Sequence, residues 1–138
     1  MKPTPCYCGL APPYALCCGR WHTPTGWLQA PTPEALMRSR YSAYVLGLAP
    51  YLLETWHPDT RPAVIEPDPP GLRWLGLSVR QTRLRDPDHA TVEFVARCKL
   101  NSRAQRLHEI SRFERVSGQW RYVDGDIVGA NADPRTDP

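Results

Sequence analysis

Four cysteines lie within the first eighteen residues and are the side chains of this sequence best suited to chemistry. Cys6 and Cys8 form one pair, Cys17 and Cys18 form a second, and eight residues separate the two pairs. Thiolates bind Zn²⁺ at about 2.3 Å in a tetrahedron, and four of them leave no open position for a substrate. Glycine and proline lie between the pairs, so the chain can turn back sharply and bring both pairs to one ion. The spacing therefore predicts a structural zinc site.

Three other uses of these cysteines stay open. The first is a pair of disulfides, which would need an oxidising compartment. Residues 1–5 are not followed by the apolar segment that a secretory signal contains. We therefore expect a cytoplasmic protein with reduced thiols. A catalytic zinc needs three protein ligands and a water, and His22 is a spare ligand for such a site. Redox chemistry is the third use, although the adjacent Cys17 and Cys18 are poorly placed to bridge each other.

A hairpin further along the chain is predicted to bring a carboxylate onto an apolar face. The alternating stretches 107–116 and 119–128 are joined by Ser117-Gly118, a good two-residue turn. In that register one face carries Leu107, Glu109, Ser111, Phe113, Trp120, Tyr122 and Asp124, and the preceding strand adds Val92, Phe94 and Cys98. A carboxylate on such a face is costly to bury unless it is paired or used. Glu109 is therefore a candidate functional residue.

Three roles are open to Glu109. The favoured one is an ion pair that fixes a helix to the sheet, with Arg38, Arg40 or His57 as the partner. The second is a ligand pocket in which Glu109, His57 or Arg112 would be the catalytic candidates. The residues expected to line this pocket are Arg38, Arg40, Tyr41, Tyr44, Trp56, Ser111, Phe113, Trp120 and Tyr122. The third is simple exposure to solvent.

The elements that position these residues have clear signals. Thr32 suits a helix N-cap, Pro33 suits the first helical position, and Gly47 is a natural stop. A second, shorter helix fits residues 49–56, because His57-Pro58 ends it. Strands are predicted over residues 74–84, 90–100, 107–116 and 119–128. Helices followed by sequential strands predict an α+β domain with a mostly antiparallel sheet.

Two parts of the sequence resemble known families. The cysteine spacing from Cys6 to Gly19 resembles the SEC-C zinc motif, whose module is a protein-binding surface, and this implies a protein partner for the arm. The segments 35–47, 51–58, 92–97, 107–113 and 120–125 closely resemble the YchJ-type UPF0225 family. That resemblance implies a SEC-C arm followed by an NTF2-like cone of helices closed by a curved sheet, with no assigned activity. We expect a zinc-binding arm and linker over residues 1–30, an NTF2-like domain over 31–129 and a loose tail over 130–138.

Composition narrows the function classes. The chain is 41% hydrophobic and 22% charged, and no apolar run approaches the ~18 residues of a membrane span. Four thiolates and one Zn²⁺ would lower the formal charge from +3 to +1, and the arginines alternate with acids. The prediction is a binding module with a structural zinc, for a protein or a small molecule. A small-molecule enzyme of lyase, isomerase or hydrolase type is the alternative, and nucleic-acid binding is a second one with little support from the charge pattern.

Overall fold

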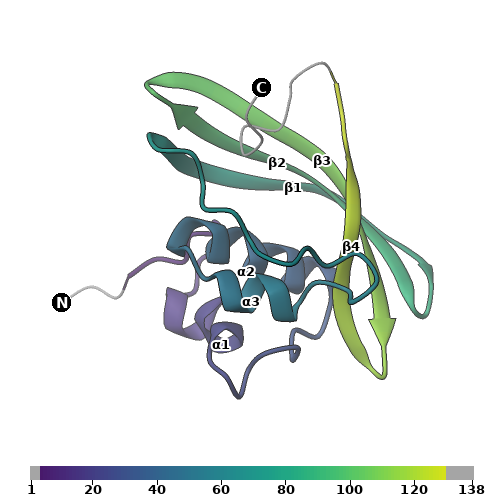
Figure 1. Ribbon diagram of the computed structural model, residues 1–138. Coiled ribbons are helices and arrows are strands. Elements are labelled where there is room, and N and C mark those ends of the chain that lie inside the picture. The colour runs from purple at the N-terminus through teal and green to yellow at the C-terminus, as the bar shows by residue number, and fades with distance from the viewer. Residues whose placement is uncertain (1–3, 130–138) are drawn as a thin grey trace.

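The computed structural model describes residues 4–129 and places a group of helices against one face of a curved sheet (Figure 1). The predicted tail, residues 130–138, lies outside the described residues. The order of elements is helical first and then four strands. The predicted α+β architecture with an antiparallel sheet is confirmed.

The two predicted helices form where the capping signals lie. α2, Pro33–Leu46, begins at Thr32, whose Oγ1 accepts a hydrogen bond from the backbone nitrogen of Ala35 at 3.0 Å. It ends at Gly47, which has a φ of 72° and adopts the left-handed conformation that glycine tolerates best. α3, Ala49–Glu54, is shorter than predicted because Trp56 leaves the helix and forms a parallel bridge with Tyr122.

Two short helical turns in the arm were not predicted from the sequence. The 3₁₀ turn η1 spans Tyr14–Leu16, and α1 spans Gly19–His22. The spacing signals that predict helices need several turns to be visible, so segments of three and four residues give none. These turns place the second pair of cysteines between them.

The sheet is a four-stranded antiparallel meander in the order β1-β2-β3-β4. Its strands are β1 (Leu72–Asp86), β2 (His89–Leu100), β3 (Arg103–Val116) and β4 (Gln119–Ile127). The pairing of β1 with β2 contains three register shifts, and a bulge bends its strand and increases the local twist. The turn at Ser117-Gly118 has φ values of 53° and 79°, the positive φ pair that a tight two-residue hairpin requires.

The predicted hairpin register is correct near the turn and wrong beyond a bulge. Trp120 pairs with Arg115 and Tyr122 with Phe113, as expected. The register then shifts past Val123, so Asp124 pairs with Arg112 instead of joining the face of Ser111. The prediction that Asp124 lies on the inner face is therefore wrong, because one extra residue turns the following side chains to the opposite face.

The hydrophobic core lies between α2 and the concave face of the sheet. Its buried members are Ala30, Leu36, Met37, Tyr41, Ala90, Val92, Phe94, Ala96, Leu107, Phe113 and Trp120. A second cluster around Ala43, Tyr51 and Leu52 joins α2 to α3 and to the tryptophans of the arm. Among residues 4–129, no helix has the length and apolar character needed to cross a membrane. α2 is thus packed on both sides, with the sheet on one and the arm and α3 on the other (Figure 1).

Candidate metal centre and binding cavity

The four N-terminal cysteines meet in a single buried cluster. Their sulfur atoms all lie within 4.8 Å of one another, and each residue is at most 6% exposed. The Sγ atoms of Cys8 and Cys17 are 3.7 Å apart, which is close to the edge of about 3.8 Å for a tetrahedron with 2.3 Å Zn–S bonds. That distance is too long for a disulfide, and all five cysteines, including Cys98, have free thiols. The donor set and its spacing fit a tetrahedral metal ion.

Local backbone turns bring the two cysteine pairs together. Gly9, with a φ of 91°, follows Cys8 and reverses the chain. The backbone nitrogen of Cys17 then donates to the carbonyl of Tyr14 at 3.0 Å, which closes the turn before the second pair. Gly19 is required beside it, because an added Cβ would lie 2.7 Å from the same carbonyl oxygen of Tyr14. The short loop therefore builds the cluster largely from its own residues.

The electrostatics of the cluster call for a cation. The pKa of Cys8 is lowered to about 5, chiefly because its sulfur accepts a hydrogen bond from the Cys18 thiol. The pKa of Cys18 is raised by the same hydrogen bond, and burial raises the pKa of Cys17 to about 11. The opposite shifts of Cys8 and Cys18 come from the same hydrogen bond between their sulfur atoms. Four thiolates in this volume would repel one another unless a metal ion compensated their charge.

His22 is not placed as a metal ligand. Its Nε2–H donates to the backbone carbonyl of Ser39 at 2.8 Å, and its Nδ1 accepts from the Tyr14 hydroxyl at 2.6 Å. Both ring nitrogens are therefore engaged, and the metal-competent group within the described residues consists of the four thiols. Burial lowers the pKa of His22, which favours the neutral ring that this pair of hydrogen bonds requires. His22 instead fixes the arm to α2.

Arg38 also serves the arm rather than the cavity. Its Nη1 donates to the backbone carbonyl of Cys8 at 2.9 Å, and its Nε pairs with Glu34 one turn earlier on α2 at 2.9 Å. The expected place of Arg38 among the pocket residues is not observed, because this side of α2 faces the cysteine cluster. Ser42, one turn further along, lies 4.0 Å from the Cys6 sulfur. The division of the chain at residue 30 stays a prediction.

A cavity of about 270 Å³ opens between α2, the connector to β1 and the inner face of the sheet. Seven predicted pocket residues line it: Arg40, Tyr41, Tyr44, Trp56, Ser111, Phe113 and Tyr122. Glu109, the carboxylate predicted on this face, lines it as well. Trp120 does not, because it lies in the core next to the hairpin turn and packs there with 6% of its surface exposed.

The sequence did not predict the contribution of the connector to this cavity. Pro62, Val64, Ile65, Glu66 and Asp68 form part of its wall. The abundance of proline in this stretch predicted an extended segment, and extended chain carries no periodic signal for the side that faces the protein. The remaining lining residues come from α2 and from the first three strands: Met37, Trp74, Phe94, Ala96 and Leu107.

Glu109 forms the polar centre of the cavity. It is 5% exposed, and its Oε2 accepts hydrogen bonds from the Ser111 hydroxyl and, at 3.3 Å, from the Tyr122 hydroxyl. Phe94 is its partner on β2, so apolar surface lies beside it. Burial of a carboxylate is tolerated only with such partners. The predicted placement of Glu109 on the inner face is observed, and its burial rules out the third role, simple exposure to solvent.

Arg40 is the buried cation of the same cavity. Its Nη1 donates to the backbone carbonyl of Leu52 at 2.8 Å and to the Thr55 hydroxyl at 2.7 Å. The guanidinium carbon lies 5.0 Å from the ring centroid of Trp56 and 4.5 Å from that of Tyr122. These contacts join α2, the end of α3 and β4 around one charge. Arg40 thus stabilises the junction of three elements.

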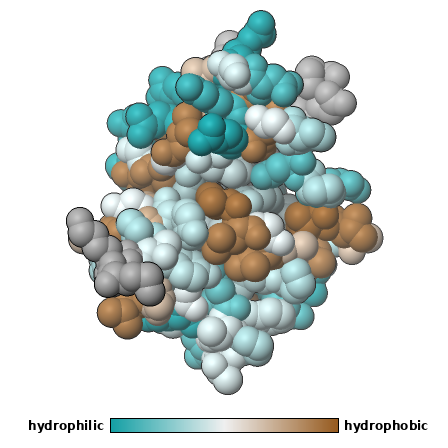
Figure 2. Space-filling model, turned by 90° about the vertical axis from the view of Figure 1, so that its left-hand side faces the viewer, coloured by the Kyte–Doolittle hydropathy of each residue, from teal (hydrophilic) through white to brown (hydrophobic). Residues whose placement is uncertain are grey.

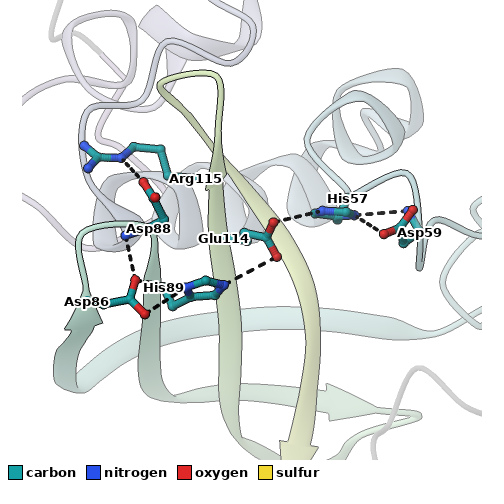
Figure 3. Close-up of polar contacts among 7 residues, drawn as sticks. All are labelled: His57, Asp59, Asp86, Asp88, His89, Glu114 and Arg115. Carbon is teal, nitrogen blue, oxygen red and sulfur yellow. Dashed lines mark hydrogen bonds and ion pairs between the residues drawn. The ribbon is translucent and has the colours of Figure 1, made fainter.

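The other two catalytic candidates lie elsewhere. Figure 3 shows His57 directed at Glu114, with 3.6 Å between Nε2 and Oε1, and Glu114 also faces His89 at 3.7 Å. Glu114 is on the side of β3 opposite Phe113, so this network lies away from Glu109. Arg112 binds Asp124 at 2.5 Å and Asp126 at 2.7 Å, where the bulge has turned them outward. The structure therefore does not bring Glu109, His57 and Arg112 together.

The fold and the cysteine cluster define an NTF2-like domain that carries a SEC-C-type arm, and comparisons with known proteins agree. The family model for "YchJ, middle NTF2-like domain" matches residues 32–125. A UPF0225 protein of Methylibium petroleiphilum is 64% identical over 91% of this chain and 90% of its own length. One of Bordetella parapertussis is 55% identical over 91% of this chain and 95% of its own. The chain belongs to the YchJ-type UPF0225 family.

Two solved structures share this fold. The solution structure of a SEC-C motif containing protein from Rhodopseudomonas palustris has a TM-score of 0.77 and 34% identity, covering 90% of this chain and 98% of its own. The crystal structure of a SEC-C motif containing protein from Psychrobacter arcticus has a TM-score of 0.70 and 26% identity, and the match covers 96% of this chain and 86% of that protein. The arm and the sheet domain thus occur together in both relatives.

Proposed function

We propose that this protein is a small-molecule-binding module whose N-terminal arm is held by a structural zinc ion. The observation that carries the proposal is the cavity of about 270 Å³ with the buried carboxylate of Glu109 inside an otherwise largely apolar wall. Ligand sites are typically preformed hollows with mostly apolar walls and a few polar groups that fix orientation. The cavity meets each part of that description.

The zinc has a supporting role in this proposal. Four thiolates fill a tetrahedral shell, so no coordination position is left for a substrate. The arm contacts α2 through Cys8–Arg38 and His22–Ser39, and the opposite side of α2 supplies Arg40 and Tyr41 to the cavity. A metal-bound arm would therefore hold the helix that forms one wall of the cavity.

Binding is favoured over catalysis by the placement of the polar groups. A general acid or base must itself lie within hydrogen-bond reach of the proton that it transfers. Glu109 has hydroxyl partners in the cavity, whereas His57 and Arg112 are engaged with carboxylates outside it. The cavity therefore supplies polar groups for recognition, and the three catalytic candidates expected from the sequence do not converge in it.

Native mass spectrometry of protein purified without added metal or ligand tests both halves. The expected spectrum shows one zinc and one small molecule per chain, and Glu109→Gln loses the small molecule while keeping the zinc. Glu93→Gln is the matched control, because Glu93 pairs with His108 on the outer face. Zinc-loaded protein that carries no small molecule and binds none from a chemically diverse library would overturn the ligand half. Protein that binds no zinc would overturn the proposal of a structural zinc in the arm.

The arm offers an observation in favour of a second function, a contact with a protein partner. Tyr7, Leu10 and Leu16 are 36%, 43% and 66% exposed on the arm. Figure 2 shows that apolar residues also gather on the face seen from the left-hand side of Figure 1. Exposed apolar groups near one another mark contact sites. The control variant is Leu84→Ser, which changes an exposed leucine of β1. This function would be supported by a partner that binds the wild type and this control but neither Leu10→Ser nor Leu16→Ser. Equal binding by the wild type and all three variants would refute it.

A further inference from the structure

The charged groups of the cavity are unequal in number. Among the described residues that line it, three carboxylates, those of Glu66, Asp68 and Glu109, stand against one guanidinium, that of Arg40. Arg40 is also held by Leu52, Thr55 and two aromatic rings, which fixes it at the α3 side of the cavity. The cavity therefore carries an excess of negative charge. A site of one sign inside low-dielectric walls attracts ligands of the opposite sign.

Two of the carboxylates lie together on the connector. Glu66 is exposed and Asp68 is half-buried, so this pair lies toward the entrance, whereas Glu109 is buried on the sheet. The Oδ2 of Asp68 accepts a hydrogen bond from the Trp74 indole at 2.8 Å. This bond fixes the carboxylate and the indole ring beside each other. A charged group entering here would meet both.

Aromatic rings complete the same part of the cavity. Trp74 packs edge to face against Tyr41, with 5.9 Å between the ring centroids and 77° between the planes. Aromatic faces attract cations, and the attraction is stronger where the contact is shielded from water. The protein already uses this interaction, because the Arg40 guanidinium lies over the rings of Trp56 and Tyr122. Acids beside aromatic faces are the groups that recognise organic cations.

We infer that the ligand of this cavity is a small organic cation, an amine with an apolar body, whose charged end lies beside Asp68, Glu66 and Trp74. The inference rests on the proposed function and specifies its ligand class. The apolar body would lie against the inner face of the sheet, where Phe94, Ala96 and Leu107 line the cavity. A volume of about 270 Å³ limits that body to about one ring with a short chain.

Three probes of similar shape test the charge: 2-phenylethylamine, 2-phenylethanol and 3-phenylpropanoate. Their affinities for the zinc-loaded protein are measured by calorimetry and by the fluorescence of the cavity tryptophans. We expect the amine to bind about tenfold more tightly than the alcohol, and the carboxylate to bind most weakly. The double variant Glu66→Gln/Asp68→Asn should remove that preference while leaving the alcohol unchanged, since the new amide at position 68 keeps an oxygen for the Trp74 indole. Glu93→Gln should retain the preference.

The outcomes separate the two proposals. Equal binding of amine and alcohol, or tighter binding of the carboxylate, would overturn the cation inference and leave the cavity as a ligand site. A preference for the amine that survives the double variant would also overturn it, because the charge would then act elsewhere. If none of the three probes binds, the cation inference is overturned. The proposed function then stands only if native mass spectrometry shows a bound small molecule that Glu109→Gln loses.

Discussion

Gly125 on β4 lies directly against the side chain of Glu109 on β3. A Cβ built on Gly125 would be 2.7 Å from the Cδ of Glu109 and 2.9 Å from its Cγ. Both distances are shorter than any normal carbon contact, so the buried carboxylate occupies the space that a larger residue at 125 would fill. The position of the polar centre of the cavity therefore depends on a glycine in the neighbouring strand.

The first prediction concerns this pair. Gly125→Ala should lower the free energy of unfolding by about 1–3 kcal/mol, because overpacking forces the Glu109 side chain out of its hydrogen bonds. Urea denaturation measures the loss. In the double variant Gly125→Ala/Glu109→Ala the cost should be smaller than the sum of the single costs, since the clash has been removed. Strictly additive costs would show that the two side chains do not compete for this space.

The second prediction concerns the metal. Cys8→Ser should reduce the zinc content from about one ion per chain to about zero, because a hydroxyl is a poor substitute for a buried thiolate ligand. Cys98→Ser is the matched control, since Cys98 is equally buried on β2 but lies outside the cluster. Zinc is measured by plasma mass spectrometry after dialysis. Equal zinc in both variants would mean that the metal is bound elsewhere.

The same variant reports on the contact between the arm and α2. The carbonyl of Cys8 accepts from Arg38, and the Cys6 sulfur lies beside Ser42. Loss of the metal should therefore increase amide exchange in α2, whereas β2 and β3 keep their protection because they pair with strands on both sides. Uniform loss of protection across the sheet would show instead that the arm is part of one cooperative unit with the whole domain.

Local signals account for the parts of the fold that the sequence predicted well. The cysteine pairs needed only a short turn to meet, and Thr32 and Gly47 mark both ends of α2 through their own backbone and side-chain chemistry. The hairpin at Ser117-Gly118 defined a register that places Glu109 on the inner face. Each of these features depends on residues close together in the chain, so sequence alone can define it.

Features that depend on distant contacts were not predictable. The bulge at Val123 gives no local signal, and its carbonyl is accommodated by donors from Trp56 and Thr60, more than sixty residues earlier. The same bulge moved Asp124 to the outer face. His22 suited a metal ligand by residue type, but its partners Tyr14 and Ser39 became neighbours only through packing of the arm on α2. Residue type indicated the chemistry, and tertiary contacts decided its use.

The third prediction concerns Arg40. Arg40→Lys keeps the charge but loses the planar group that lies over two rings and donates to Leu52 and Thr55. We expect a loss of about 1–3 kcal/mol of folding free energy, since a lysine cannot reproduce this geometry. Arg103→Lys, a change at an exposed position of β3, should be neutral within about 0.5 kcal/mol. An equally small effect at both positions would show that Arg40 contributes only its charge.

The last prediction is a pH dependence that arises from His22. Burial lowers the pKa of His22 in the folded protein below its ordinary value of 6.5, so the unfolded chain binds a proton more readily than the folded one. The resulting contribution of His22 to the free energy of unfolding is fully present above pH 6.5. It is lost as the pH falls from 6.5 through the folded-state pKa, and the free energy of unfolding then changes by at most about 1.4 kcal/mol per pH unit. His22→Gln removes the titrating ring. Urea unfolding of both zinc-loaded proteins between about pH 7.5 and about pH 5.5 should give a smaller loss for the variant. Equal losses would assign the pH dependence to other groups, such as protonation of the cysteine ligands.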